Sequence, residues 1–228
     1  AIDGPAGAGK STMARAVAQS LGFLYIDTGA MYRAVGLKAL RSGVSTRDAD
    51  AVARLVADTD VDLRVVDGDP RVFLDGEDVS GQIRIPEVSV AASDVSVVPA
   101  VRHRLVDLQR AIASRNPVVM DGRDIGSHVL PDAACKIFLT ASPEERARRR
   151  YEELVGKGIQ GQSLEQVLAD MVYRDRQDST RALAPLVQAP DAVRLDTTGL
   201  TVSESVERIR AIVRTRLDHE EPAGGACP

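Results

Sequence analysis

The chain carries Gly4-Pro5-Ala6-Gly7-Ala8-Gly9-Lys10-Ser11, which matches the pattern G-x-x-x-x-G-K-[ST] at every defined position. An apolar stub, Ala1-Ile2-Asp3, precedes this stretch, and a helix-like run over 12–21 follows it. Glycines let successive backbone N–H groups point inward toward anionic oxygens, and the start of the helix adds the positive end of its dipole. We therefore expect a phosphate loop between a parallel strand, which would include Ala1-Ile2-Asp3, and a helix.

The side chains of this loop fit the phosphates of a nucleoside triphosphate. Lys10 can reach the β- and γ-phosphates, and the Ser11 hydroxyl can hold a Mg²⁺ ion, directly or through water. The residues predicted to bind ATP here are Gly4, Pro5, Ala6, Gly7, Ala8, Gly9, Lys10, Ser11 and Thr12. Switch GTPases also need a guanine-reading Asn-Lys-x-Asp run, which this sequence lacks. The small kinases that act on nucleotides, nucleosides or shikimate remain.

The bulk composition is that of an ordinary globular protein. Of the 228 residues, 44% are hydrophobic and 27% are charged. No apolar run approaches the roughly 20 residues of a membrane span, so we expect neither a span nor a leader. A net charge of −4 gives no reason to expect a nucleic-acid surface. The two Cys and three His residues are scattered, which suits a reducing cytoplasm and disfavours a zinc site.

Short apolar runs alternate with amphipathic stretches along most of the chain. The predicted strands are 23–26, 117–120, 135–139 and 192–195. Capping-box patterns that begin at Ser142, Ser163 and Thr201 mark helix starts between and after them. Strands that alternate with helices predict an α/β fold with a parallel sheet covered by helices on both faces.

One segment breaks this alternation. Residues 61–65 alternate with period two, 71–74 form a second run, and Gly-containing turns at 67–70 and 75–76 bound them. We predict a small antiparallel insert over about residues 61–95. The tail 220–228 is rich in Gly and Pro and is predicted to be disordered.

Two predicted strand ends carry polar residues suited to an acceptor. The first reads Asp27-Thr28-Gly29 and continues to Arg33, and the second reads Asp121-Gly122-Arg123-Asp124. Asp-Thr-Gly alone resembles an aspartic protease, but that chemistry needs two carboxylates in one site. In open α/β sheets, ligands bind at the carboxyl ends of strands. A solvated Arg33 and a surface ion pair between Arg123 and Asp124 remain the alternatives.

Arginines cluster further along the chain. Arg146, Arg149 and Arg150 share one helical face, and so do Arg174, Asp178 and Arg181. Glycines after the first cluster suit the hinge of a lid over about 149–162. Two anionic substrates that must converge would explain such clusters, because positioning and electrostatics carry phosphoryl transfer. A solvated Arg-rich face is the alternative, and a genomic base bias would also explain why Lys occurs only at 10, 38, 136 and 157.

The sequence resembles the bacterial cytidylate (CMP) kinase family over nearly its whole length. The resemblance rests on 4–11, Asp-Thr-Gly-Ala-Met-Tyr-Arg at 27–33, Glu-Asp-Val-Ser-Gly at 77–81, Ile-Arg at 83–84, Asp-Gly-Arg-Asp at 121–124, 136–139, and Arg181 before Ala184-Pro185-Leu186. The stretch 77–81 is the most discriminating, because adenylate, guanylate and shikimate kinases do not resemble it there. The resemblance implies one nucleotide-kinase domain over 1–228 with a P-loop NTPase core, a monophosphate-binding insert and a short lid.

The resemblance also implies roles for particular residues. Cytosine would be bound by Ser93, Arg102 and Asp124; the acceptor phosphate by Arg33, Arg123, Arg174 and Arg181; the sugar by Asp178 and Thr28; and ATP by Arg149 and Arg150 of the lid. Lys10, Arg123, Arg174 and Arg149 would serve catalysis. Many members have Ser where this chain has Thr28, which keeps the hydroxyl but adds a methyl group near the sugar.

The expected function is ATP- and Mg²⁺-dependent phosphorylation of CMP and dCMP, in the pyrimidine metabolism of the cytoplasm, by a monomer that binds neither nucleic acid nor membrane. UMP or another monophosphate is the alternative acceptor. A nucleotide-binding regulatory protein without an acceptor is the alternative of another class, although it would have no use for a second anion site.

Overall fold

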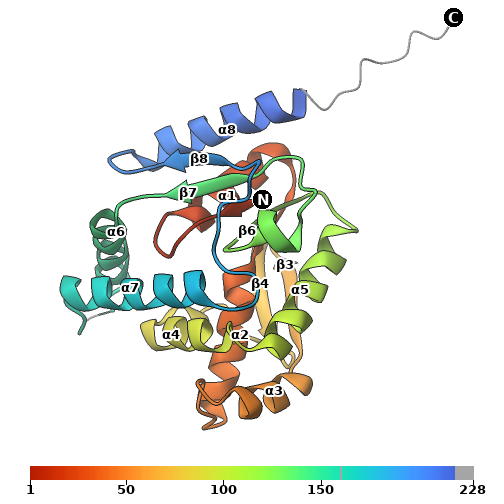
Figure 1. The fold of residues 1–228 in the computed structure, drawn as a ribbon, viewed down its shortest axis with the longest axis vertical. Helices are drawn as coiled ribbons and strands as arrows, with labels where there is room; N and C mark the ends of the chain where they lie inside the picture. The colour runs from red at the N-terminus through yellow and green to blue at the C-terminus, as the bar shows by residue number, and fades with distance from the viewer. Residues whose placement is uncertain (160, 219–228) are drawn as a thin grey trace, which may run out of the picture.

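The protein is built around a five-stranded parallel sheet (Figure 1). The computed structural model describes residues 1–159 and 161–218. The strands of this sheet are β1 (Ile2–Asp3), β2 (Leu24–Asp27), β6 (Val118–Gly122), β7 (Ile137–Thr140) and β8 (Val193–Asp196). They pair in the order β2-β6-β1-β7-β8, all parallel. The strand that leads into the phosphate loop, β1, therefore lies at the centre.

Helices cover both faces of this sheet. The helical elements are α1 (Lys10–Leu21), α2 (Thr28–Arg41), α3 (Ala49–Ala57), η1 (Gln82–Arg84), α4 (Pro86–Val95), α5 (Pro99–Ala113), the π-helical turn η2 (Ile125–Val129), α6 (Pro143–Gly156), α7 (Leu164–Thr180) and α8 (Val202–Asp218). On one face, α1 and α8 pack on the sheet through Val17 and Ile209. On the other face, Val106 of α5 and Ile125 of η2 pack against Met120.

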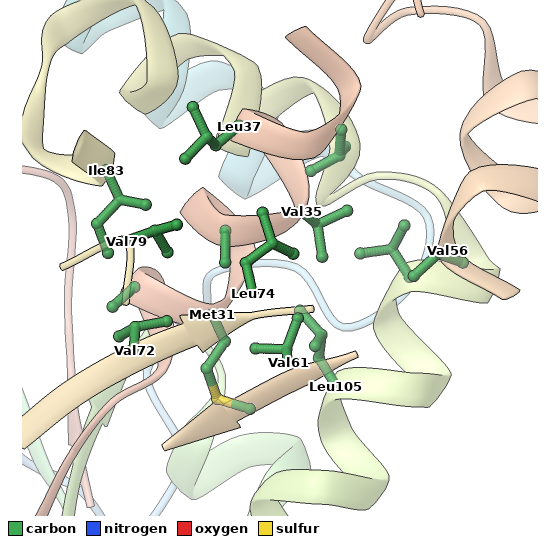
Figure 2. Close-up of a cluster of buried hydrophobic side chains, with 14 of the residues drawn as sticks. Met31, Val35, Leu37, Val56, Val61, Val72, Leu74, Val79, Ile83 and Leu105 are labelled. Atoms are coloured by element: carbon green, nitrogen blue, oxygen red, sulfur yellow. The ribbon is translucent and has the colours of Figure 1, made fainter. Parts of the chain in front are cut away.

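The insert is an antiparallel sheet of β3 (Val61–Val66), β4 (Asp69–Leu74) and β5 (Glu77–Asp78). Figure 2 shows its core, where Met31 and Val35 of α2 lie against Val61 and Leu74. Val61 and Leu74 are register partners across the β3–β4 ladder. The insert thus packs on α2, the helix that starts at the end of β2.

Local sequence explains where several helices begin. The Asp27 carboxylate accepts a hydrogen bond from the Ala30 N–H, which caps α2. Ser163 and Gln166 form a complete capping box at α7, and Thr201 exchanges the equivalent bonds with Glu204 at α8. By contrast, α1 follows Gly9 with no side-chain cap. Its first N–H groups therefore remain open to an anion.

The predicted α/β fold with an antiparallel insert is confirmed. Each predicted strand is present with its bounds shifted by one or two residues. The prediction of a full capping box at Ser142 was wrong in one half: Ser142 accepts from the Glu145 N–H, but the Glu145 carboxylate pairs with Arg148 and Arg149. The predicted limits of the insert, about 61–95, and of the lid, about 149–162, stay predictions. The tail 220–228 lies outside the described residues.

Candidate active site

A cavity of about 960 Å³ opens at the carboxyl ends of the parallel strands. Its walls come from the phosphate loop, the starts of α1 and α2, α4, the end of β6, the lid side of α6, α7, and the loop before α8. Among the described residues, no helix combines the length and hydropathy that crossing a bilayer would need. The cavity is the place where the predicted site residues meet.

The phosphate loop forms one end of the cavity. Gly4 has a φ of 148°, and a Cβ there would lie 1.9 Å from the Leu139 carbonyl oxygen, so no other residue fits against β7. The Lys10 ammonium is buried and donates to the Pro5 carbonyl at 2.7 Å. Burial, and then the charge of Arg123, lower the pKa of Lys10 to about 7.

Two carboxylates end neighbouring strands beside this loop. Asp27 and Asp121 are register partners across β2 and β6. Asp121 accepts hydrogen bonds from Ser11 Oγ at 3.0 Å and from the Tyr25 hydroxyl at 2.9 Å. Burial, and then the neighbouring Asp27, raise the pKa of Asp121 to about 6. Thr28 Oγ1 donates to the Asp121 carbonyl at 2.7 Å, which ties α2 to the end of β6.

Asp27 has a different environment. Its carboxylate pairs with Arg33 at 3.0 Å and with Arg84, from the insert side, at 3.1 Å. Burial alone would raise the pKa of Asp27, but Arg33 and Arg84 outweigh burial and hold it below its ordinary value. The pair of cations therefore lowers the pKa of Asp27, whereas the pKa of Asp121 is raised.

Arginines from three parts of the fold line the cavity: Arg33 of α2, Arg123 after β6 and Arg174 of α7. Arg123 donates to Asp178 Oδ2 at 2.6 Å, and this pairing, against the opposing effect of burial, raises the pKa of Arg123. Arg174 lies one turn before Asp178 on α7 and lines the same cavity. In the described part of the chain, no hydrogen bond or ion pair holds the Arg174 guanidinium, and its Nε is buried without a partner. Burial, and then Arg123, lower the pKa of Arg174 to about 10.

A polar set lies deeper, under α4 and α5. Asp124 accepts from Arg102 through one oxygen and from Arg181, at 2.9 Å, through the other. Arg102 is only 1% exposed, does not line the cavity, and leaves Nε and Nη1 without partners. Ser93 lines the cavity, and its Oγ is also buried without a partner. Such groups are costly in a folded protein unless a ligand or water satisfies them.

The lid arginines take three different positions. Arg149 donates to the Thr197 carbonyl at 2.7 Å and pairs with Glu145, so it faces the loop before α8. Arg150 pairs with Glu153 and reaches the Arg84 carbonyl at 3.4 Å. Both line the cavity, whereas Arg146, which shares their predicted face, is buried behind the phosphate loop.

The structure therefore brings nearly all the predicted site residues to one cavity. Those that line it are Ala6, Gly7, Gly9, Lys10, Ser11, Thr12, Thr28, Arg33, Ser93, Arg123, Asp124, Arg149, Arg150, Arg174, Asp178 and Arg181. Gly4, Pro5 and Ala8 belong to the loop but do not line the cavity, and Arg102 lies beneath it.

Sequence reasoning gave no role to several residues of this site. Asp27, Arg84 and Asp121 were visible as parts of motifs, and their position at or near strand ends was the available signal. The loop 200–202 forms a further wall that no motif marked.

The residues around Ser11 fit a Mg²⁺ ion. This ion prefers oxygen ligands, and the Ser11 hydroxyl and the Asp121 carboxylate supply them side by side next to the phosphate loop. Burial and the neighbouring Asp27 raise the pKa of Asp121 although Lys10 opposes them, so a further cation beside this carboxylate would be favourable. The donor set therefore suits a hard divalent cation.

Comparison with known proteins gives consistent matches. A family model described as cytidylate kinase matches residues 1–215. The chain is 60% identical over 215 residues to a cytidylate kinase of Pelotomaculum thermopropionicum, with 93% of this chain and 94% of that protein covered. It is 55% identical over 210 residues to a cytidylate kinase of Symbiobacterium thermophilum, with 92% of each covered.

Solved structures with a similar fold are much more distant in sequence. One is an uncharacterized protein from Eubacterium ventriosum, with a TM-score of 0.51 and 15% identity over 94% of this chain and 96% of that one. Another is a gluconokinase from Sinorhizobium meliloti, with a TM-score of 0.50 and 15% identity over 97% of this chain and 95% of that one. These likenesses show the fold alone.

Proposed function

This chain belongs to the cytidylate kinase family of nucleoside monophosphate kinases, and we propose that it transfers the γ-phosphoryl group of ATP to CMP and dCMP. The donor would bind at the phosphate loop, and the acceptor would bind between α2, α4, the end of β6 and α7. The cavity joins the two places and would hold both substrates in one chamber.

The observation that carries the proposal is the unpaired cation Arg174. Nearby cations are already matched, since Asp178 holds Arg123 and Asp27 holds Arg33. A guanidinium whose Nε is buried without a partner, whose pKa is lowered and which lies close to other arginines is unfavourable until an anion arrives. The phosphate of CMP supplies that anion, and planar guanidinium groups bind phosphate with paired hydrogen bonds.

The unsatisfied groups of Ser93 and Arg102 support a cytosine site. A cytosine edge offers an amino donor beside ring and carbonyl acceptors. Ser93 Oγ and the free N–H groups of Arg102 match the acceptors. Asp124 already accepts from Arg102 and Arg181, but an ionised carboxylate has further lone pairs for the cytosine amino group.

The sugar would lie between the base site and the arginines. Asp178 and Thr28 line the cavity there and offer an acceptor and a hydroxyl for ribose. The Thr28 hydroxyl is already used as a donor to the Asp121 carbonyl, so toward the sugar it acts as an acceptor. Because no 2′-hydroxyl contact is indispensable for the phosphate and base sites, we include dCMP as a substrate.

The reaction requires alignment more than covalent help from the protein. An oxygen of the CMP phosphate attacks the γ-phosphorus, a new P–O bond forms, and the bond to the β–γ bridging oxygen breaks in line with it, releasing ADP. Lys10 and Arg123 stabilise the charge that builds up on the transferred group, while Arg174 and Arg33 hold the attacking phosphate. Arg149 and Arg150 close the donor side against water.

Mg²⁺ would be held by Ser11 and Asp121, where it would neutralise the charge of the donor phosphates. From the proposed CMP substrate we also infer a place in pyrimidine nucleotide metabolism, and we propose that the protein acts in the cytoplasm and as a monomer.

The test is the release of ADP from Mg-ATP, coupled to NADH oxidation, with CMP, dCMP, UMP, AMP, GMP or no acceptor. We expect rapid turnover with CMP and dCMP alone. If turnover with UMP were as fast as turnover with CMP, the acceptor would not be restricted to CMP and dCMP. ADP release that does not depend on any acceptor would contradict a kinase, and tight ATP binding without turnover would favour a nucleotide sensor.

A further inference from the structure

The phosphate loop is held from behind by a closed ring of polar contacts. The Ala6 N–H donates to Asp175 Oδ1 at 3.2 Å, and Arg146 Nη1 donates to the Ala6 carbonyl at 2.8 Å. The ring closes because the same Arg146 nitrogen lies 2.7 Å from Asp175 Oδ2. Both peptide planes that flank Ala6 are therefore fixed by side chains of α6 and α7.

The ring is shielded from solvent at Arg146, whereas the Asp175 side chain is 25% exposed. The Arg146 side chain is 6% exposed, and its Nε donates to the Ala141 carbonyl at 3.0 Å. Gly7, with a φ of 72°, lies so close to the two helices that a Cβ there would be 2.5 Å from Met171 Cε and 3.2 Å from Arg146 Cβ. Neither Arg146 nor Asp175 lines the cavity, so both act from outside it.

The geometry of trans peptides carries the effect of Arg146 to the front of the loop. The described residues contain no cis peptide bond, so the C=O and N–H of each peptide plane point in opposite directions. Arg146 holds the Ala6 carbonyl on the side away from the cavity. The N–H of Gly7, in the same peptide plane, therefore points toward the cavity. No acceptor for the Gly7 N–H is found among the described residues, and Gly7 lines the cavity. This N–H is thus aimed at a donor phosphate.

Asp175 acts on the preceding peptide in the same way. Asp175 holds the Ala6 N–H on the side away from the cavity. The Pro5 carbonyl, in the same peptide plane, therefore points toward the cavity. That carbonyl is the group to which the Lys10 ammonium donates. The position of Lys10 in the loop is therefore linked, through one peptide plane, to a carboxylate on α7.

The helix that carries Asp175 also carries acceptor residues. Arg174 is its neighbour in sequence, and Asp178, which holds Arg123, follows within one turn. One helix, α7, thus contacts the phosphate loop through Asp175 and the acceptor site through Arg174 and Asp178.

We propose that Arg146 and Asp175 are positioning residues that set the phosphate loop, and with it Lys10 and the Gly7 N–H, at a fixed distance from the acceptor arginines. This inference rests on the proposed function, because only a transfer between two bound anions needs that alignment. An error of about 1 Å in such an alignment costs about 100-fold in rate.

The test compares Arg146→Met, Asp175→Asn and the double variant with two controls on α7. Asp170→Asn makes the same chemical change earlier in α7, at a carboxylate that pairs with Gln162. Arg176→Met removes an exposed guanidinium beside Asp175. For each protein, kcat and KM for CMP would be measured, together with the Kd for CMP and for Mg-ADP by calorimetry and the melting temperature.

We expect each single variant to lose at least about tenfold in kcat and to bind Mg-ADP more weakly, while the Kd for CMP changes by less than about twofold. The double variant should be no worse than the more damaged single variant, because both residues act through Ala6. The controls should match the wild type.

The proposal is overturned if the single variants keep the wild-type kcat, if their losses multiply, or if CMP binding falls together with kcat. The Asp175→Asn change keeps the size of the side chain but removes the charge that pairs with Arg146, so it tests the idea even if Arg146→Met does not fold. A wild-type protein with no CMP-dependent turnover would overturn the proposed function as well. Normal wild-type turnover with unaffected variants would overturn this inference alone.

Discussion

Ser11 Oγ lies 3.0 Å from Asp121 Oδ2, so the start of α1 and the end of β6 meet at a hydroxyl and a carboxylate. The Tyr25 hydroxyl holds the other oxygen of Asp121 at 2.9 Å. The carboxylate is buried beside Asp27, and its pKa is raised to about 6. A cation at this point would relieve the repulsion between the two carboxylates.

Replacing Asp121 with Asn should raise the Mg²⁺ concentration needed for half-maximal turnover by about 10- to 100-fold. The amide keeps an acceptor for Ser11 or Tyr25 but lacks the charge that holds the ion. The measurement is the rate against free Mg²⁺ at saturating ATP and CMP, with the exposed Asp107→Asn as a control. An unchanged Mg²⁺ dependence would remove Asp121 from the metal site.

Replacing Lys10 with Ala should lower kcat by about 100-fold or more, because the reaction loses a cation that stabilises the transferred phosphoryl group. Lys38→Met is the matched control, since Lys38 pairs with Asp75 on the insert and does not line the cavity. The check is steady-state ADP release. Near-normal turnover of the Lys10 variant would refute its role.

Donor binding should take up a proton at alkaline pH. With a pKa of about 7, Lys10 is largely neutral in the free protein at about pH 8, and the phosphates of a bound nucleotide favour its charged form. We expect uptake approaching one proton at about pH 8 and little uptake by Lys10 at about pH 6. Calorimetry of Mg-ADP binding in buffers of different ionisation enthalpy measures it. Equal uptake by Lys10→Ala would assign the proton elsewhere.

Replacing Ser93 with Ala should lower kcat/KM for CMP by about tenfold, because a buried hydrogen-bond partner of the base is lost. The KM for ATP should stay the same. Ser114→Ala is the control, because Ser114 directly follows α5 and its hydroxyl donates to the Ala111 carbonyl. If CMP and ATP kinetics change equally, Ser93 does not contact the base.

Much of the fold follows from local sequence. The phosphate-loop motif places β1 and α1, and the alternation of apolar runs with capped helices gives the parallel sheet. Period two in 61–65 and the turns after it indicate the antiparallel insert, which the structure forms from β3 to β5. The strand ends at Asp27 and Asp121 indicate the place of the site, because such ends meet at one edge.

The partners within the site could not be predicted in the same way. Arg33, assigned to the acceptor phosphate, pairs in the structure with Asp27, the N-cap of the same helix, and Arg84 joins them from the insert. Arg146 shares a helical face with Arg149, yet it lies behind the phosphate loop, since α6 packs directly on Gly7. These contacts form only when elements that are distant in the sequence pack together. The periodicity of the sequence does not indicate how such elements pack.

The most direct test of the central claim follows the phosphoryl group itself. Phosphorus NMR of the protein with Mg-ATP and CMP would show which product receives it. The account predicts that the signals of CDP and ADP grow at equal rates, and that both grow more slowly by about 100-fold or more with Lys10→Ala. Inorganic phosphate in place of CDP, or an unchanged spectrum with CMP, would contradict the account.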